Sequence, residues 1–191
     1  MTRRPERGCL LVAAPMLTDP NFDRTVVLML EYSPDGAVGI VLNRPSGAEI
    51  PWPLDSWRDV AADPTVVFIG GPVQPEVGLG LARHTLDAPH DAASGAADSE
   101  LLPGIRTLDL NIDDPSVLSR SDLSVRLFAG YAGWGPGQLD GELDEGAWFV
   151  VDAEDDDAFT ADPADLWWRV LGRQDNELRR LAFYPPDLAM N

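Results

Sequence analysis

GYAGWGPGQLDGELDEGAWF, residues 130–149, is the stretch that decides the fold. A strand-like run, Val125 to Ala129, leads into it, and a second such run, Ala147 to Val151, leads out of it. Its glycines at positions 130, 133, 135 and 137 indicate backbone with positive φ, or backbone packed too closely for side chains. Leu139 and Leu143 are one helical turn apart, which predicts a short helix between the two runs. The predicted unit is therefore strand, glycine turn, short helix and strand.

The glycine turn has a structural and a ligand-binding interpretation. A glycine-rich turn before a helix is typical of phosphate-binding loops. However, the Walker A motif requires a lysine, which this chain lacks, and the glycine spacing does not match G-x-G-x-x-G. We therefore predict a structural corner in which Trp134 is buried between the turn and the sheet. Gly130 and Gly133 are expected where a Cβ would clash or where φ is positive.

Four further blocks of sequence accompany this stretch. They are LLVAAPMLTDPNFDRTVVLMLEY, GAVGIVLNRP, GGPV and DLWWRVLG. Together with GYAGWGPGQLDGEL and GAW, they form an ordered set over about residues 8–191 that resembles the YqgE/AlgH family of bacterial proteins. The resemblance implies a single α+β domain over residues 1–191, with a mixed sheet bent into a pseudo-barrel and a few short helices packed around it. It implies little about activity, because the family is largely uncharacterised and one branch is described as a transcriptional regulator.

The rest of the chain divides into short strands, short helices and one long loop. Apolar runs predict strands at residues 9–14, 25–32, 37–42, 66–69, 77–82 and 105–110. Short helices are predicted at residues 53–61, 115–120, 163–172 and 178–182. Residues 85–104 are rich in Ala, Ser, Asp, Gly and Pro, so we expect a mobile surface loop that contributes little to the core.

The charge of the chain limits its partners. Its 32 acidic and 14 basic residues give a formal net charge of −18, and every basic residue is an arginine. A field of this sign repels phosphate backbones and anionic lipid surfaces. We therefore expect neither direct binding to nucleic acid nor docking on a membrane.

The cysteine content and the N-terminus predict a cytoplasmic protein. Cys9 is the single cysteine, so no intramolecular disulfide forms, which is consistent with a reducing compartment. It lies in the apolar run GCLLVAA, where a buried, inert thiol is expected. Two arginines before residues 9–17 imitate an export signal, but Glu6 and Pro15 interrupt the pattern. We interpret this segment as the first strand, and no apolar stretch is long enough to span a membrane.

The sequence contains no recognisable catalytic or metal-binding set, and we expect no catalytic residue, no metal and no cofactor. Two histidines are present, and neither H-E-x-x-H nor G-x-S-x-G occurs. The acidic runs Asp140–Glu145 and Asp152–Asp157 do not place residues as a calcium loop requires. We interpret both runs as solvated acidic faces. Trp167 and Trp168 are interpreted as one core and one partly exposed aromatic residue.

Residues in turns at strand ends are the candidate lining of a binding pocket. We predict six such residues: Asn43, Arg44, Gly70, Gly71, Trp134 and Gln138. Asn43 is suited to bridging backbone groups, and Arg44 is suited to binding a carboxylate. In so acidic a chain we expect an internal ion pair at Arg44, and likewise at Arg24 with Asp19 or Asp23.

From the sequence we favour a non-enzymatic regulatory or binding protein whose partner is a protein or a small ligand. One alternative is an enzyme or a small-anion-binding protein that uses a strand-end pocket near Arg44 and Trp134. The other alternative is a regulator that binds nucleic acid directly, which the net charge disfavours.

Overall fold

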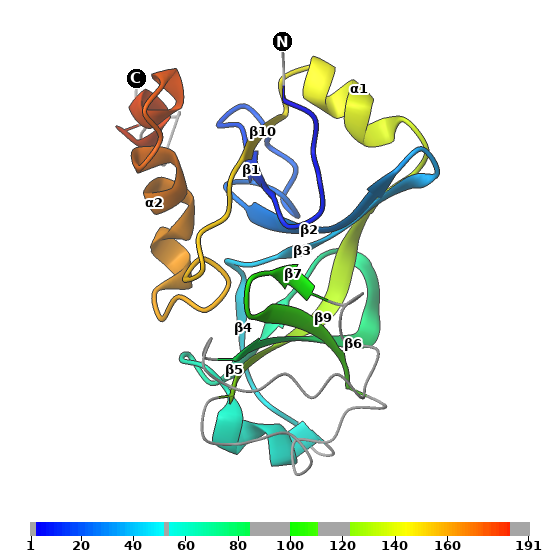
Figure 1. Ribbon diagram of the computed structural model, residues 1–191, viewed down its shortest axis with the longest axis vertical. Helices are drawn as coiled ribbons and strands as arrows, with labels where there is room; N and C mark the ends of the chain where they lie inside the picture. The colour runs from blue at the N-terminus through cyan, green and yellow to red at the C-terminus, as the bar shows by residue number, and fades with distance from the viewer. Residues whose placement is uncertain (1–2, 52–53, 85–99, 111–122, 184–191) are drawn as a thin grey trace.

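The computed structural model describes residues 3–51, 54–84, 100–110 and 123–183, and it shows a ten-stranded sheet with short helices around it (Figure 1). The strands are β1 (Leu10–Ala13), β2 (Val26–Ser33), β3 (Gly36–Val41), β4 (Pro45–Glu49), β5 (Val66–Ile69), β6 (Val73–His84), β7 (Glu100–Leu102), β8 (Ile105–Asp109), β9 (Leu123–Trp134) and β10 (Trp148–Val151). The helices are η1 (Leu54–Val60), α1 (Gln138–Asp144), η3 (Pro163–Asp165), α2 (Leu166–Gly172) and η4 (Glu177–Phe183), where η marks a 3-10 helix.

The predicted α+β class is confirmed, and the sheet is open. Its main path runs β10-β1-β2-β3-β9-β6-β8-β7, and β4 and β5 form a branch that joins at β9. All described pairings between strands are antiparallel except the parallel pairing of β5 with β9. The end strands β10 and β7 each pair with one described strand, so the bent sheet is not closed by a pairing between them.

Strand β9 organises the molecule because it changes partner along its length. Residues Leu127–Ala129 pair with β5 in parallel, and Ala132–Trp134 pair with β3 antiparallel. Since β3 and β5 run in opposite directions along the same side of β9, their carboxyl ends face each other beside Gly130. Gly130 has a φ of +70°, as predicted.

The predicted glycine turn begins later than expected. Strand β9 continues through Gly130 and Gly133 to Trp134, and the turn occupies residues 135–137 before α1. Our prediction for Gly133 is wrong: a Cβ there would lie 3.4 Å from Tyr131 Cε2 and 3.6 Å from Val73 Cγ2, which are ordinary contacts, and its φ is not positive. Glycine spacing alone does not distinguish a turn from a strand that crosses another segment closely.

The C-terminal helix closes one face of the core. Helix α2 buries Leu166, Trp167, Val170 and Leu171 against the cluster that includes residues of β1 and β2. The indole nitrogen of Trp167 donates to the carbonyl oxygen of Ala13 at 2.9 Å. Trp167 is fully buried whereas Trp168 is partly exposed, as predicted.

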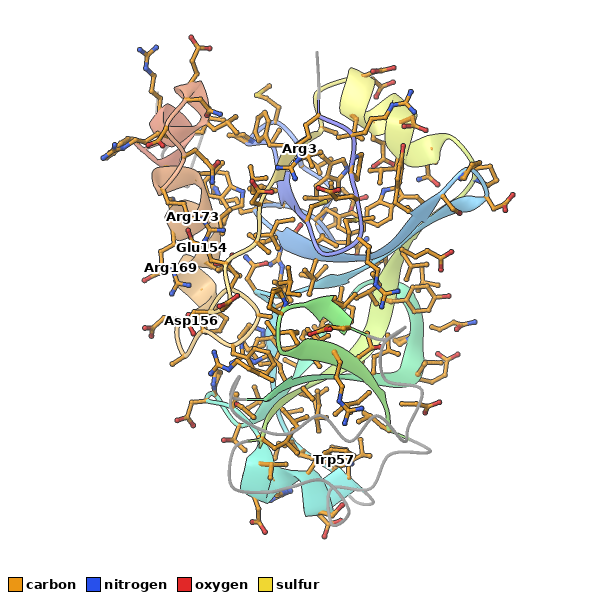
Figure 2. The ribbon with its side chains drawn as sticks, in the orientation of Figure 1. Arg3, Trp57, Glu154, Asp156, Arg169 and Arg173 are labelled. Carbon is orange, nitrogen blue, oxygen red and sulfur yellow. The ribbon has the colours of Figure 1, made fainter. Side chains whose placement is uncertain are left out.

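The acidic run before α2 is not simply a solvated face. Asp157 is 2% exposed, and its carboxylate accepts two hydrogen bonds of 2.7 Å from the Arg173 guanidinium. A buried carboxylate needs such a partner, because leaving water is otherwise costly. Figure 2 shows Arg173, Glu154, Arg169 and Asp156 in one row along α2 and the loop before it. The interpretation of residues 152–157 as solvated is therefore wrong for Asp157.

A buried arginine joins this C-terminal segment to the sheet. Arg126 on β9 is 2% exposed, and its Nη2 donates to the carbonyl oxygens of Asp63 and Thr160. Its guanidinium lies 4.4 Å from the ring centroid of Phe68. Burial lowers the pKa of Arg126 to about 10, and the nearby positive charge of Arg83 acts in the same direction. Nothing in the sequence around Arg126 marks it as a buried residue.

The predicted secondary structure differs from the structure at residues 100–104 and at β4. Two further predictions are not tested, because residues 85–99 of the expected mobile loop and the helix expected at 115–120 lie outside the described residues. For residues 100–104 the loop prediction is wrong, because Glu100–Leu102 forms β7 and Leu101 is 8% exposed. Strand β4 was missed because all five of its residues are exposed and show no alternation of apolar side chains.

Cys9 is buried, as the sequence predicts. Its side chain lies in the apolar cluster that contains Leu11 and Trp148. Burial raises the pKa of the thiol, so the reactive thiolate is disfavoured.

Candidate functional site

A half-open pocket of about 180 Å³ lies where the carboxyl ends of β3 and β5 meet. Seven residues line it: Pro20, Asn21, Val41, Arg44, Ile69, Gly71 and Pro72. They come from the loop before β2, from the ends of β3 and β5, and from the links that follow these strands. Connections that follow strand ends commonly carry binding residues. Here β9 brings two such strand ends together.

Backbone hydrogen bonds fix the two strand ends that form the pocket. The Val41 N–H donates to the Gly70 carbonyl oxygen at 2.8 Å, and the Ile69 N–H donates to the Arg44 carbonyl oxygen at 2.8 Å. The Gly70 N–H donates to the Ala129 carbonyl oxygen at 2.9 Å. The links after β3 and β5 are therefore tied to each other and to β9, which gives the pocket a rigid floor.

Gly70 and Gly71 are needed for the close crossing of this link over β9. A Cβ on Gly70 would lie 2.3 Å from the Gly130 carbonyl oxygen. A Cβ on Gly71 would lie 2.2 Å from the Tyr131 carbonyl carbon, and the φ of Gly71 is +153°. Gly71 also lines the pocket, whereas Gly70 does not, so the primary role of Gly70 is structural.

Asn43 and Arg44 have different roles although they are adjacent. The Asn43 side chain donates to the Arg24 carbonyl oxygen at 2.8 Å and accepts from the Val26 N–H at 2.9 Å. It therefore bridges backbone groups at the start of β2, and it does not line the pocket. Arg44 does line the pocket, and its Nη2 donates to the Asp23 carbonyl oxygen at 2.6 Å.

The internal ion pair expected at Arg44 is absent. Within the described ranges of the chain, no carboxylate forms an ion pair with its guanidinium. The Asp23 contact uses a backbone oxygen, which carries no full charge. Arg24, the other arginine of this region, lies 5.7 Å and 5.8 Å from the ring centroids of Trp167 and Trp168.

Trp134 and Gln138 belong to a neighbouring structural cluster that is held together by Glu142. Trp134 is 6% exposed, so its predicted burial is confirmed. One oxygen of Glu142 accepts from the indole N–H of Trp134 at 2.9 Å and from that of Trp148 at 2.7 Å. The other oxygen accepts from the Gln138 side-chain amide at 2.9 Å. These contacts fix α1 against the sheet. Glu142 was not predicted as a site residue, because no sequence pattern marks a glutamate as the acceptor for two indoles outside its helix.

The loop before β2 connects this cluster to the pocket. Phe22 lies 6.2 Å from Trp134 and 5.4 Å from Trp148, measured between ring centroids. On either side of it, Asn21 lines the pocket and Asp23 holds Arg44. Of the six predicted site residues, the structure therefore places Arg44 and Gly71 in the pocket and the other four in supporting positions.

Ile69 is a pocket residue that sequence reasoning missed. It ends the apolar run of β5, yet it is 50% exposed. A large apolar side chain exposed beside a cation is the usual composition of a small-ligand site. The run itself predicted burial, and only the structure shows that its last residue faces outward.

The residues that line the pocket are mostly apolar. Its lining contains one cation, one amide and several apolar groups, and no Asp, Glu, His, Cys, Ser or Lys that could serve as an acid, a base or a nucleophile. Across the described residues, no group of three or more His, Cys, Asp or Glu side chains is placed to hold a metal ion.

The fold and pocket define an α+β protein with a single-arginine pocket at a strand junction, and comparison with known proteins gives its family. The chain belongs to the DUF179 family, described as AlgH-like, whose model matches residues 10–179. A UPF0301 protein of Streptomyces avermitilis is 47% identical over 184 residues, covering 96% of this chain and 94% of that protein. A UPF0301 protein of Mycobacterium tuberculosis is 39% identical over 196 residues, covering 99% and 92%.

Two solved structures share the fold. A crystal structure of a Corynebacterium diphtheriae protein matches with a TM-score of 0.86 and 28% identity, covering 96% of this chain and 95% of that one. The solution structure of the AlgH protein from Pseudomonas aeruginosa matches with a TM-score of 0.64 and 26% identity, covering 98% and 100%. The family resemblance predicted from the sequence is thus confirmed. Among the helices that the structure describes, none has the length and apolar character needed to cross a membrane.

Proposed function

We propose that this protein is a non-enzymatic binding protein that takes a small anion in the pocket at Arg44. The observation that carries the proposal is Arg44, a residue that lines the pocket and whose guanidinium forms no ion pair with a carboxylate among the described residues. In a chain with 32 acidic residues, a half-buried arginine without an ion pair is the group best suited to an external anion. The pocket volume favours a small ligand over a folded protein partner.

The proposal includes a cytoplasmic location, which the single cysteine supports. In this proposal, regulation would depend on whether the anion is bound, and it would not require contact with DNA. The absence of an acid, a base or a nucleophile from the lining favours binding over the enzymatic alternative.

Replacement of Arg44 by glutamine is expected to abolish anion binding while leaving the fold intact. Arg44 supplies the only positive charge among the lining residues that the structure describes, and its loss removes charge-assisted hydrogen bonds to an anion. Two-dimensional NMR titrations with phosphate, sulfate, acetate and 3-methylbutanoate are the measurement. At least one anion should shift the resonances of Asn21, Ile69 and Gly71 in the parent protein, and none should do so in the variant.

Arg180→Gln is the matched control for this experiment. Arg180 is exposed on η4, and its replacement changes the net charge by the same amount. It should preserve the shifts of the parent protein. The proposal fails when no anion of the panel shifts these resonances, or when Arg44→Gln responds as the parent does. Chemical conversion of the anion during the titration would instead support the enzymatic alternative.

Direct binding to duplex DNA is expected to be undetectable at physiological salt. The net charge of −18 opposes a polyanion, and non-specific binding depends on cations that neutralise phosphates. The measurement is an electrophoretic mobility shift with a random duplex, repeated at low salt. A salt-sensitive shift at sub-micromolar protein concentration would contradict this expectation and favour a nucleic-acid-binding regulator.

A further inference from the structure

We propose that the ligand of the Arg44 pocket is a monocarboxylate with a compact apolar body, and not a phosphate or a dicarboxylate. This inference rests on the proposed function and specifies the class of anion. It follows from three features of the pocket: the number of cations, the number of free donors on Arg44, and the nature of the remaining lining.

The pocket offers one full positive charge. Among the described residues that line it, Arg44 is the only charged one, and the chain contains no lysine. Inorganic phosphate near neutral pH carries between one and two negative charges on four oxygens, and protein sites for it normally combine several donors and cations. A monocarboxylate carries one charge, which a single guanidinium neutralises. The charge balance in the pocket therefore selects a monoanion.

The field of the whole protein adds to this selection. At a formal net charge of −18, repulsion of a free anion grows in proportion to the charge that the anion carries. A dianion such as succinate or hydrogen phosphate meets twice the repulsion that a monocarboxylate meets. A second carboxylate in the ligand would also find no cation in the lining.

The donors of Arg44 match a carboxylate. Of its three guanidinium nitrogens, Nη2 donates to the Asp23 carbonyl oxygen, and neither Nε nor Nη1 donates to a described residue. Each two-donor edge of a guanidinium includes Nη2, and the second N–H of Nη2 remains for an edge that binds the two oxygens of a carboxylate through parallel hydrogen bonds. The Asp23 contact fixes the side chain in advance, which reduces the entropy lost on binding.

The rest of the lining requires an apolar body. Pro20, Val41, Ile69 and Pro72 contribute apolar surface, and Asn21 contributes one amide. Ile69 is 50% exposed without a ligand, so a branched aliphatic chain seated on it would remove apolar surface from water. The volume of about 180 Å³ is below the usual range for drug-sized ligands, which limits the body to a few carbon atoms.

The test compares matched ligands by NMR on the full chain. The probes are 3-methylbutanoate, its neutral amide 3-methylbutanamide, succinate and inorganic phosphate, with the Asn21 side-chain amide and the Ile69 methyl groups as reporters. N-acetylvaline is a fifth probe, because it presents the same chemistry as a peptide C-terminus and so distinguishes a chain end from a free acid. We expect 3-methylbutanoate or N-acetylvaline to bind at least about tenfold more tightly than the amide, succinate or phosphate.

The outcomes separate this inference from the proposed function. Tighter binding of phosphate or succinate than of both monocarboxylates overturns the inference and leaves the small-anion proposal standing. Equal binding of the acid and the amide, without tighter binding of phosphate or succinate, overturns both. No binding of any probe overturns the inference, and the proposed function fails with it when sulfate and acetate do not bind either. Arg44→Gln should weaken the monocarboxylate at least about tenfold, and Ile69→Ser should weaken it while leaving any response to phosphate unchanged. An unaltered monocarboxylate affinity in Ile69→Ser would also contradict the inference, because the apolar wall would then play no part.

Discussion

Replacement of Trp134 by alanine is expected to lower the free energy of unfolding by about 3–5 kcal/mol. Trp134 is 6% exposed, and its ring packs on Phe22 and stands edge-on to Trp148 at 5.9 Å between centroids. The substitution leaves a cavity in this cluster and removes one of the hydrogen bonds to Glu142. Because a domain of this kind has a total stability of roughly 5–15 kcal/mol, the loss is a large part of it.

Trp134→Phe is the matched variant for this prediction. It retains an aromatic ring in the cluster but removes the indole N–H, while Trp148 and Gln138 continue to donate to Glu142. Urea unfolding followed by circular dichroism should therefore show a clearly smaller loss for phenylalanine than for alanine. If Trp134→Ala unfolds at the same urea concentration as the parent, the packing role assigned to this residue is wrong. Loss of anion binding without loss of stability would instead favour a direct ligand contact at Trp134.

The parts of the fold that could be predicted from the sequence are those with a local physical cause. Strand β5 was predicted at its observed bounds because Val66–Ile69 is a short apolar run that ends at two glycines. The burial of Trp134 could be predicted because a large aromatic side chain inside a glycine-rich corner needs a place in the core. The helix after Pro136 could be predicted from two leucines one turn apart, and both are buried in α1.

The parts that could not be predicted depend on contacts that no local sequence pattern indicates. Asp157 looks like any member of an acidic run until Arg173, sixteen positions later, is brought back onto it by α2. Glu142 is an ordinary helical glutamate until Trp134 and Trp148 place their indoles on one of its oxygens. Strand β4 has no apolar pattern, and only its pairing with β5 reveals it.

The candidate site shows the same division. Arg44 and Gly71 could be selected because they follow predicted strands, where functional residues commonly lie. Their convergence on one pocket depends on β9, which pairs with β5 and then with β3. Nothing in the local sequence of either strand indicates that their carboxyl ends face each other. For the same reason Pro20 and Asn21, which belong to the loop before β2, were not among the predicted lining residues.

A series of glycine-to-alanine replacements is expected to show that the crossing of the β5–β6 link over β9 is what requires glycine. Gly71→Ala should be the most damaging, at a cost of about 2–5 kcal/mol, because it combines a strained φ with overpacking. Its φ is +153°, and the added Cβ would lie 2.2 Å from backbone of Tyr131. Backbone atoms in the middle of a sheet cannot move aside as a flexible side chain can.

Gly70 and Gly133 serve as graded controls. Gly70→Ala meets the Gly130 carbonyl oxygen at 2.3 Å without a positive φ, so overpacking alone should cost about 1–3 kcal/mol. Gly133→Ala meets only side-chain atoms at ordinary contact distances, so its stability should stay within about 1 kcal/mol of the parent. Thermal unfolding under identical conditions should give the highest melting temperature for Gly133→Ala, a lower one for Gly70→Ala and the lowest for Gly71→Ala. A Gly133→Ala variant that melts as low as Gly71→Ala would show that the glycines of this region serve the flexibility of β9, and not the close crossing at the floor of the pocket.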